Sequence, residues 1–188
     1  MLKYIEEEKK FLEITGFRNL KIENSEEFIK TMRKELPNNA WIQFFNAELV
    51  ATWQHLYFAV LNAMIAFAQK ANISKSMAME TMLYASAQRQ IQKAIDLMGV
   101  KCSSTNIAVV IVGENFESVH AVLSVISKRV GKEPEDMVLK ISEDKKEKIR
   151  NSFEIDTVEF ETVTKKDNHQ EALVDIVIER IALLSTQL

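Results

Sequence analysis

The sequence contains few of the residues that bridge or break a polypeptide chain. Cys102 is the single cysteine among 188 residues, which excludes an intrachain disulfide and fits a reducing compartment. Four glycines and two prolines leave no stretch with the composition of a long flexible linker. A hydrophobic content of 47% is enough for one core. We therefore predict a single domain over residues 1–188.

Charge and hydropathy exclude two further classes of protein. The net charge is −3, which excludes a generally basic coat for DNA or RNA, so any RNA contact requires a local patch. No run of about eighteen apolar residues is present, so a membrane is not expected as a partner. Residues 1–10 are too charged for a signal peptide, which predicts a cytoplasmic protein. They resemble a loosely ordered extension, although Leu2, Tyr4 and Ile5 could add to a sheet.

The sequence also lacks the motifs of common catalytic sites. It has no phosphate-cradling glycine loop, dinucleotide fingerprint, paired cysteines or zinc-helix motif. His55, His120 and His169 are scattered without the spacing of metal ligands, and a surface or hydrogen-bonded role is expected for His55. We predict a protein that is not an enzyme and that holds no metal or cofactor, while an unfamiliar enzyme stays possible.

Hydrophobic periodicity predicts an α+β fold with a small mixed or antiparallel sheet and about seven helices. Strands are expected at residues 11–17, 41–45 and 107–112, and the unbroken apolar run of the third places it near the centre of the sheet. Residues 137–141 could form an edge strand, and residues 158–161 alternate like one. No purpose is assigned to residues 156–167.

Capping residues mark most of the helix starts. Asn24 with Glu27 and Asn168 with Glu171 have the spacing of capping boxes, and Ser142 begins a further helix. Asn46 is expected to cap the longest helix, which runs to about residue 71. Residues 116–130 form another helix, and the charged residues 144–150 are predicted to be a solvated face.

The stretch of residues 74–99 carries most of the functional information. Ser76 is placed to cap a helix over residues 77–84, and a second helix is expected to begin after Ser86 and to end before Gly99. Backbone N–H groups near Ser86, the positive end of the helix dipole, and the side chains of Arg89 and Lys93 would suit a phosphate. From the spacing alone, the alternative to a phosphate site is that these residues form an ordinary solvated surface. The apolar residues that we expect to form one buried stripe are Ile91, Ala94, Ile95 and Met98.

Two segments carry a resemblance to a known family. Residues 85–91, ASAQRQI, with Ala94, Ile95 and Gly99 further on, are similar to a pattern A-S-G-Q-R-Q-I…A-I…G. Residues 46–52, NAELVAT, followed by His55, are similar to a pattern N-A-(D/E)-x-V-A-T…H. Both patterns belong to the kinase-binding regulatory subunit of the KEOPS (EKC) complex, the TPRKB family, and the match is to an archaeal-type member. Ala87 stands where the archaeal pattern has Gly.

The resemblance implies a non-catalytic subunit of the complex that installs threonylcarbamoyladenosine in tRNA. Such a subunit would bind the small atypical protein kinase of the complex and recruit tRNA through its 3′ CCA end. The apolar face that we assign to the kinase is Val174, Ile178 and Ile181, although periodicity alone leaves open whether this face completes the core. The residues that we assign to tRNA are Ser86, Ala87, Gln88, Arg89, Gln90 and Lys93, with Ile73, Met77 and Tyr84 available to the bases.

A second hypothesis comes from a different functional class. The chain could be a small-ligand-binding protein, or an unrecognised enzyme, that uses a cleft between the long helix and residues 85–89. Stabilisation by a metabolite alone would favour this hypothesis, whereas co-purification of a kinase and RNA would favour the regulatory subunit.

Overall fold

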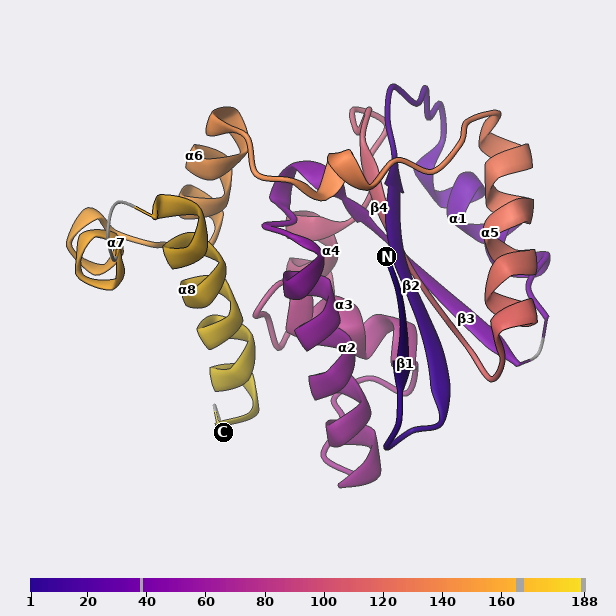
Figure 1. The fold of residues 1–188 in the computed structure, drawn as a ribbon, viewed down its shortest axis with the longest axis horizontal. Coiled ribbons are helices and arrows are strands. Elements are labelled where there is room, and N and C mark those ends of the chain that lie inside the picture. Colours follow the sequence, from indigo (N-terminus) through magenta and orange to yellow (C-terminus); the bar gives the residue numbers. More distant parts are fainter. Residues whose placement is uncertain (38, 165–167, 187–188) are drawn as a thin grey trace. The chain divides into compact units, whose positions relative to one another are not determined.

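The computed structural model describes residues 1–37, 39–164 and 168–186, and Figure 1 shows their fold. The chain divides into two compact units. Unit 1 comprises residues 1–47 and 99–138, and unit 2 comprises residues 48–98 and 139–188. The predicted α+β class is confirmed, because the described residues contain both helices and one antiparallel sheet. The assignment of residues 1–188 to a single domain stays a prediction.

Unit 1 is built on a four-stranded antiparallel sheet with the strand order β1-β2-β4-β3. Strand β4 lies inside the sheet and every one of its residues is buried, as its unbroken apolar sequence predicts. Alternate residues Ile107, Val109 and Ile111 face the side on which helices α1 and α5 lie (Figure 1). The bounds of these elements are Leu2–Ile5 for β1, Lys10–Phe17 for β2, Ala40–Asn46 for β3, Ile107–Gly113 for β4, Ser25–Lys34 for α1 and Phe116–Val130 for α5.

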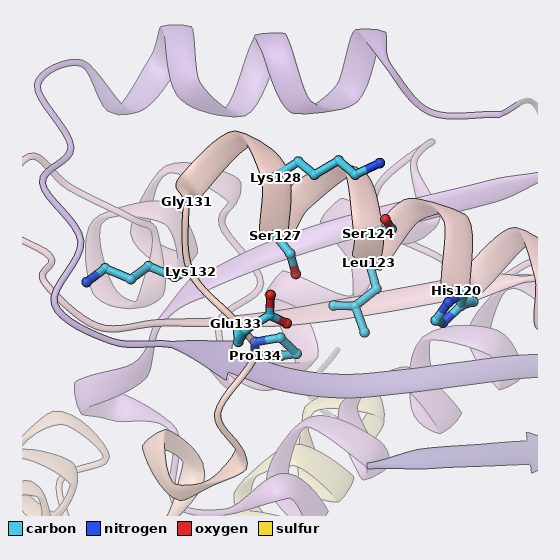
Figure 2. Close-up of a pocket in the computed structure, with 9 residues that line it drawn as sticks. All are labelled: His120, Leu123, Ser124, Ser127, Lys128, Gly131, Lys132, Glu133 and Pro134. Carbon is cyan, nitrogen blue, oxygen red and sulfur yellow. The ribbon is translucent and has the colours of Figure 1, made fainter.

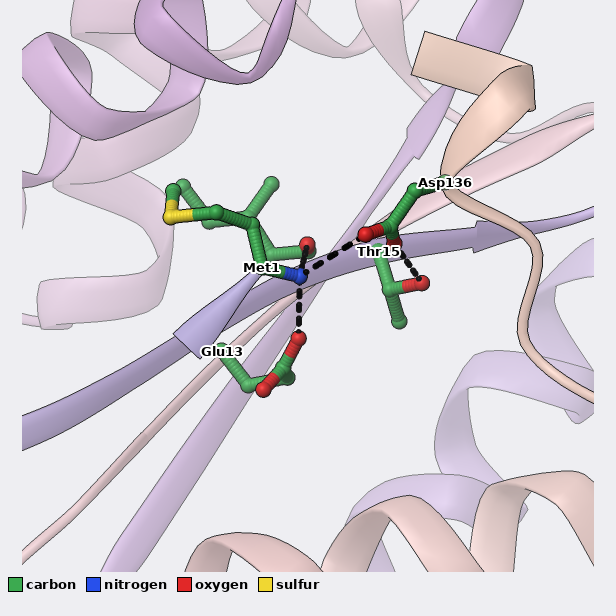
Figure 3. Close-up of polar contacts among 5 residues, drawn as sticks. Met1, Glu13, Thr15 and Asp136 are labelled. Atoms are coloured by element: carbon green, nitrogen blue, oxygen red, sulfur yellow. Dashed lines mark hydrogen bonds and ion pairs between the residues drawn. The ribbon is translucent and has the colours of Figure 1, made fainter. Parts of the chain in front are cut away.

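Two predictions in unit 1 need correction. The first residues form the edge strand β1, which pairs with β2, so the alternative that Leu2, Tyr4 and Ile5 add to a sheet is confirmed and the loosely ordered extension is wrong. Part of the expected edge strand 137–141 is instead a 3-10 turn, η2, over Asp136–Leu139. The Thr15 hydroxyl donates to the Asp136 carboxylate at 2.6 Å, and the Met1 ammonium contacts the same carboxylate at 3.3 Å (Figure 3). Side-chain contacts of this kind hold η2 without a ladder of strand hydrogen bonds.

Gly16 explains how η2 comes so close to the sheet. The N–H of Glu135 donates to the carbonyl of Gly16 at 2.8 Å. A Cβ at Gly16 would lie 2.7 Å from the Ile107 carbonyl oxygen and 3.0 Å from the Val138 side chain, so a larger residue would push both away. Absence of a side chain at this position therefore permits the close approach.

Unit 2 consists of helices and short turns. Helix α2 is its centre, since α2 packs on α3 and on α8, and buries Leu56, Ala59, Val60 and Ala63. The bounds are Trp53–Ala68 for α2, Met77–Ala85 for α3, Ile91–Met98 for α4, Glu143–Ser152 for α6, Thr157–Val163 for α7 and His169–Leu183 for α8, with 3-10 turns η1 over Ala47–Leu49 at the boundary of the units and η3 over Leu184–Thr186. No helix in the described part of the chain is long and apolar enough to span a membrane.

Helix boundaries differ from the prediction at two places. Asn46 is the last residue of β3 rather than a helix cap, and α2 begins after Thr52 and ends at Ala68. The expected strand 158–161 is part of α7, because the Asp156 carboxylate caps this helix by accepting from the N–H of Glu159 at 2.8 Å. Val158 and Phe160 are only two alternating apolar residues, and so short a strand pattern does not prevent the capped helix from forming. Residues 165–167 of the segment 156–167 lie outside the described residues.

Candidate functional site

The turn that follows α3 is the centre of the candidate site, and its backbone differs from the prediction. The N–H of Ser86 donates to Met82, that of Ala87 to Tyr84, and that of Gln88 to Leu83, at 3.0, 2.9 and 3.0 Å. These donors therefore satisfy the last carbonyls of α3 and are not available to a ligand. Ser86 lies at the C-terminal end of α3, and α4 begins only at Ile91. The prediction of free donors and a positive helix end at Ser86 is wrong.

The two hydrogen bonds of Ala87 and Gln88 form a Schellman motif, in which the residue after the helix end adopts a left-handed conformation. Ala87 has a φ of +50°, inside this region. Glycine adopts such a φ without strain, whereas a Cβ makes it unfavourable by about 1–2 kcal/mol. The Gly of the archaeal pattern is thus explained by the backbone of the turn, with no need for a ligand that approaches closely.

His55 connects the two segments that carry the family resemblance. Its buried Nδ1 accepts from the N–H of Ala51 at 3.1 Å, so Nε2 carries the proton and donates to the carbonyl of Ala85 at 2.7 Å. Burial lowers the pKa of His55 to about 4, and the Ala85 carbonyl opposes this shift, so the imidazole is neutral near pH 7. The expected hydrogen-bonded role is confirmed. His55 holds the turn at residues 85–88 in place.

Arg89 and Lys93 are both exposed, but they are not a pair on one helix. Arg89 precedes α4, and its Nη1 donates to the carbonyl of Leu184 at 3.4 Å. A cation at this end of α8 and η3 complements the negative end of the helix dipole. Lys93 lies in the first turn of α4. Gln90 is exposed and Gln88 is half-buried, so both amides reach the surface beside these cations.

Burial changes the set of apolar residues that could contact a ligand. Ser86 is 1% exposed, and its hydroxyl donates to the carbonyl of Met82 at 2.8 Å. Tyr84 is 6% exposed. Neither side chain therefore offers a surface for a base. Met77 is half-buried, while Ile73 is 39% exposed. The buried carboxylate of Glu80 accepts from the N–H groups of Ile73 and Ser74 at 3.1 and 2.6 Å. Ile73 is therefore held at the surface.

Helix α4 exposes more apolar surface than its periodicity predicts. Ala94 and Met98 are buried as expected. Ile91 and Ile95 are instead 43% and 38% exposed, so the predicted buried stripe is wrong for these two residues. They lie one turn apart on α4, Lys93 lies between them in sequence on the same helix, and Gln90 directly precedes the helix. The surface around the turn thus combines exposed isoleucines, amides and cations.

A hollow of about 260 Å³ lies beside the turn. Helix α6, like α3, ends here in a Schellman motif, with Glu154 at a φ of +54°. Two helix C-termini carry negative partial charge, and the guanidinium of Arg180 is already paired with Glu159 at 2.8 Å. The hollow therefore favours neutral hydrogen-bonding groups over phosphate. Its lining residues are Ser86, Ala87, Gln88, Ser152, Phe153, Glu154 and Arg180.

The last four of these lining residues were not found from the sequence. They come from the end of α6, from the turn that follows it and from α8, far from residues 85–88 along the chain, and no local motif marks them. Phe153 also contacts His55 edge to face, with ring centroids 5.6 Å apart. The imidazole that holds the turn therefore also supports the wall of the hollow.

Helix α8 divides the predicted kinase-binding residues. Ile181 is fully buried, so it belongs to the core and offers no surface to a partner. Val174 and Ile178 are half-buried and lie one turn apart on α8. The opposite apolar face is buried and consists of Leu173, Ile176, Val177 and Leu184.

Lys145 is a charged residue whose predicted exposure to solvent is wrong. It was expected on a solvated face, but it is buried in the first turn of α6. Burial lowers its pKa to about 8, and the nearby Glu48 carboxylate opposes that shift. Glu48 also accepts from Lys148 at 2.6 Å. These contacts belong to the packing of unit 2.

The candidate site has the composition of a recognition surface. Among the described residues, no group of three or more His, Cys, Asp or Glu side chains could hold a metal ion. Exposed amides, cations and isoleucines surround a turn whose backbone N–H groups at residues 86–88 are already satisfied. The turn thus forms a surface of mixed polar and apolar groups on a small α+β protein.

Comparison with known proteins identifies its family. The model of the kinase binding protein CGI-121 family matches residues 17–185, so the chain belongs to this family. The regulatory protein Cgi121 of Methanocaldococcus jannaschii is 37% identical over 113 residues, which cover 60% of this chain and 70% of that relative. The resemblance seen in residues 46–52 and 85–91 is thereby confirmed.

Proposed function

We propose that the protein is a kinase-binding regulatory subunit of the KEOPS complex, which modifies tRNA with threonylcarbamoyladenosine. Membership of the CGI-121 kinase-binding family is the observation that carries this proposal. The relative from M. jannaschii is named a regulatory protein, which supports a role without catalysis. The candidate site around residues 85–88 adds exposed amides, cations and isoleucines, which can contact a binding partner. We expect the protein to act in the cytoplasm, with neither membrane nor DNA as a partner.

The kinase would bind the exposed part of α8. Val174 and Ile178 are the apolar residues of the predicted face that reach the surface, and Ile181 beneath them is part of the core. Truncation of a central interface residue costs about 1–3 kcal/mol, and a buried carboxylate costs more, so Ile178→Glu should weaken the kinase complex more than tenfold.

A matched variant separates this interface from a general effect of a new charge. Val158 on α7 is 74% exposed, so Val158→Glu makes a similar change at another apolar surface residue of unit 2. Titration calorimetry with the purified kinase should show a loss for Ile178→Glu and wild-type affinity for Val158→Glu. Equal affinities for both folded variants would contradict the assignment. Thermal melting of each free variant shows whether it is folded.

The tRNA would bind around the turn at residues 85–88 through its single-stranded 3′ CCA end. Arg89 and Lys93 supply positive side chains, and Ile73, Ile91 and Ile95 supply exposed apolar surface for bases. The amide of Gln88 lines the polar hollow, where a base edge or a ribose hydroxyl fits better than phosphate. At the single-stranded CCA end only these two cations then meet phosphates, which predicts a shallow log–log salt dependence with a slope of about −1.4 for a CCA-ended single strand.

Charge reversal tests the tRNA site. Arg89→Glu should abolish most binding to tRNA, Lys93→Glu should reduce it, and neither should change the affinity for the kinase. Because Arg89 also donates to Leu184, Arg89→Lys serves as a control that keeps the charge but not the fork of donors. Filter binding at several salt concentrations measures these effects. Wild-type tRNA affinity in Arg89→Glu would refute the site.

A small polar ligand is the second candidate for the same surface. The observation that favours it is the hollow of about 260 Å³, with its amide, hydroxyl and guanidinium groups. A neutral metabolite that raises the melting temperature of the free protein, and whose effect disappears in Gln88→Ala, would support this function. Stabilisation by a CCA-ended oligonucleotide alone would support the tRNA function instead.

A further inference from the structure

We propose that a second hollow, in unit 1, binds phosphate groups of the RNA backbone and thereby contacts the body of the tRNA. This inference rests on the proposed tRNA function and adds a binding surface distinct from the turn at residues 85–88. The hollow has a volume of about 350 Å³ and lies between the loop at residues 19–22 and the C-terminal end of α5.

Three cations from two separate segments of the chain line this hollow. They are Lys21 from the loop, Arg129 from the last turn of α5 and Lys132 beyond that helix, with the amide of Asn19 beside them. The rest of the described lining is apolar, and no carboxylate belongs to it. In a chain with a net charge of −3, such a local excess of positive charge fits an anionic ligand.

The backbone on both sides brings these cations together. Gly131 ends α5 with a φ of +65°, and the N–H of Lys132 donates to Ser127 at 3.2 Å, so the chain reverses and places Lys132 near Arg129. The N–H of Leu20 donates to Thr105 at 2.7 Å, which holds the loop before Lys21. Two separately anchored segments therefore present positive charge to one space.

Lys132 is not neutralised by its neighbour in sequence. Figure 2 shows its side chain extending away from Glu133, which points toward Ser127 in an adjoining hollow of about 500 Å³. Within the described parts of the chain, neither Arg129 nor Lys132 forms an ion pair. Lys21 contacts Glu23 at 3.6 Å, but both side chains are more than 80% exposed. A pair so exposed contributes little and can be exchanged for a phosphate.

An ordinary structural role explains only part of this arrangement. Cations in the last turn of a helix stabilise its negative end, which accounts for Lys128 and Arg129. Lys21 and Lys132 lie outside α5, so the same explanation does not cover them. Backbone phosphates, which repeat along an RNA strand, are anions that can engage several cations at once.

The test compares two charge reversals on the same part of the chain. Arg129→Glu combined with Lys132→Glu changes two lining cations, whereas Lys128→Glu changes an exposed cation of the same helix turn that does not line this hollow. Three probes separate the two sites: full-length tRNA, a blunt RNA duplex without a CCA end, and a CCA-ended single strand. Affinities are measured by fluorescence anisotropy over a range of salt concentrations, with thermal melting to confirm folding.

We expect the double variant to bind tRNA and the duplex at least tenfold more weakly, with a salt slope that is shallower by about 0.9 for each lost duplex contact. Its affinity for the CCA-ended strand should be that of the wild type, and Lys128→Glu should lose less than threefold on every probe. Equal losses in the double variant and Lys128→Glu, or no wild-type binding to the duplex, would overturn the inference. Failure of the CCA-ended strand to bind would instead overturn the proposed function of the turn.

Discussion

Replacement of Ala87 by glycine should stabilise the protein, although it removes a methyl group. Ala87 is held at a φ of +50° by the hydrogen bonds that close the end of α3. Relief of the left-handed strain is worth about 1–2 kcal/mol, and the greater freedom of glycine in the unfolded chain costs about 0.5–1 kcal/mol. At the middle of both ranges the net gain is about 0.75 kcal/mol, which in a chain of this size raises the melting temperature by roughly 1.5–3 °C.

The converse substitution provides the control for this calculation. Gly131 has a φ of +65°, and a Cβ added there would meet nothing within 4 Å, so Gly131→Ala changes backbone strain without a steric clash. It should destabilise the protein by about the amount that Ala87→Gly stabilises it. Both are measured by calorimetric melting and urea denaturation. If Ala87→Gly and Gly131→Ala are both less stable than the wild type, the Ala87 side chain contributes packing that outweighs its backbone strain. That result would refute the reasoning.

Further predictions concern the buried groups of unit 2 and the absence of catalysis. His55→Phe leaves the N–H of Ala51 and the carbonyl of Ala85 without their partner, so the free energy of unfolding should fall by about 2–5 kcal/mol in urea denaturation. Because the pKa of His55 is lowered from 6.5 to about 4, only the unfolded chain takes up this proton between those values. Its contribution to stability is therefore complete above about pH 6.5 and declines as the pH falls toward 4, and His55→Gln should flatten this part of the stability profile. The pKa of Lys145 is lowered from 10.5 to about 8, so stability should rise as the pH increases between these values, and Lys145→Met should remove this rise and increase the melting temperature at pH 7. The purified protein should neither hydrolyse ATP nor modify tRNA, and turnover that survives purification but disappears in His55→Phe or Cys102→Ser would contradict a regulatory role.

Local signals predicted much of the fold correctly. Asn24, Ser76 and Asn168 cap the helices that they were expected to cap, because an N-cap depends on a hydrogen bond to a residue three positions away. The unbroken apolar sequence of β4 likewise placed it inside the sheet, since a strand covered on both faces has no polar side. Predictions succeeded where the deciding interaction is close in the sequence.

Predictions failed where one local pattern fits two structures. A serine can accept a hydrogen bond at a helix start, or donate one to a carbonyl at a helix end, and Ser86 does the second. The prediction of a helix start at residues 86–89 therefore assigned a phosphate site to backbone N–H groups that already form hydrogen bonds within the protein. The roles of Lys145 and Ile181 depend on the helices that cover them, which no spacing along the chain reveals.

The most direct test of the proposed site compares one tRNA with and without its terminal CCA, using the purified protein alone. The account predicts that removal of the CCA lowers affinity as strongly as Arg89→Glu does, and that the two changes together lower it no further. Equal affinity for both forms of the tRNA would contradict it, because the turn at residues 85–88, with Arg89, Lys93 and the exposed isoleucines, would then be an ordinary part of the surface.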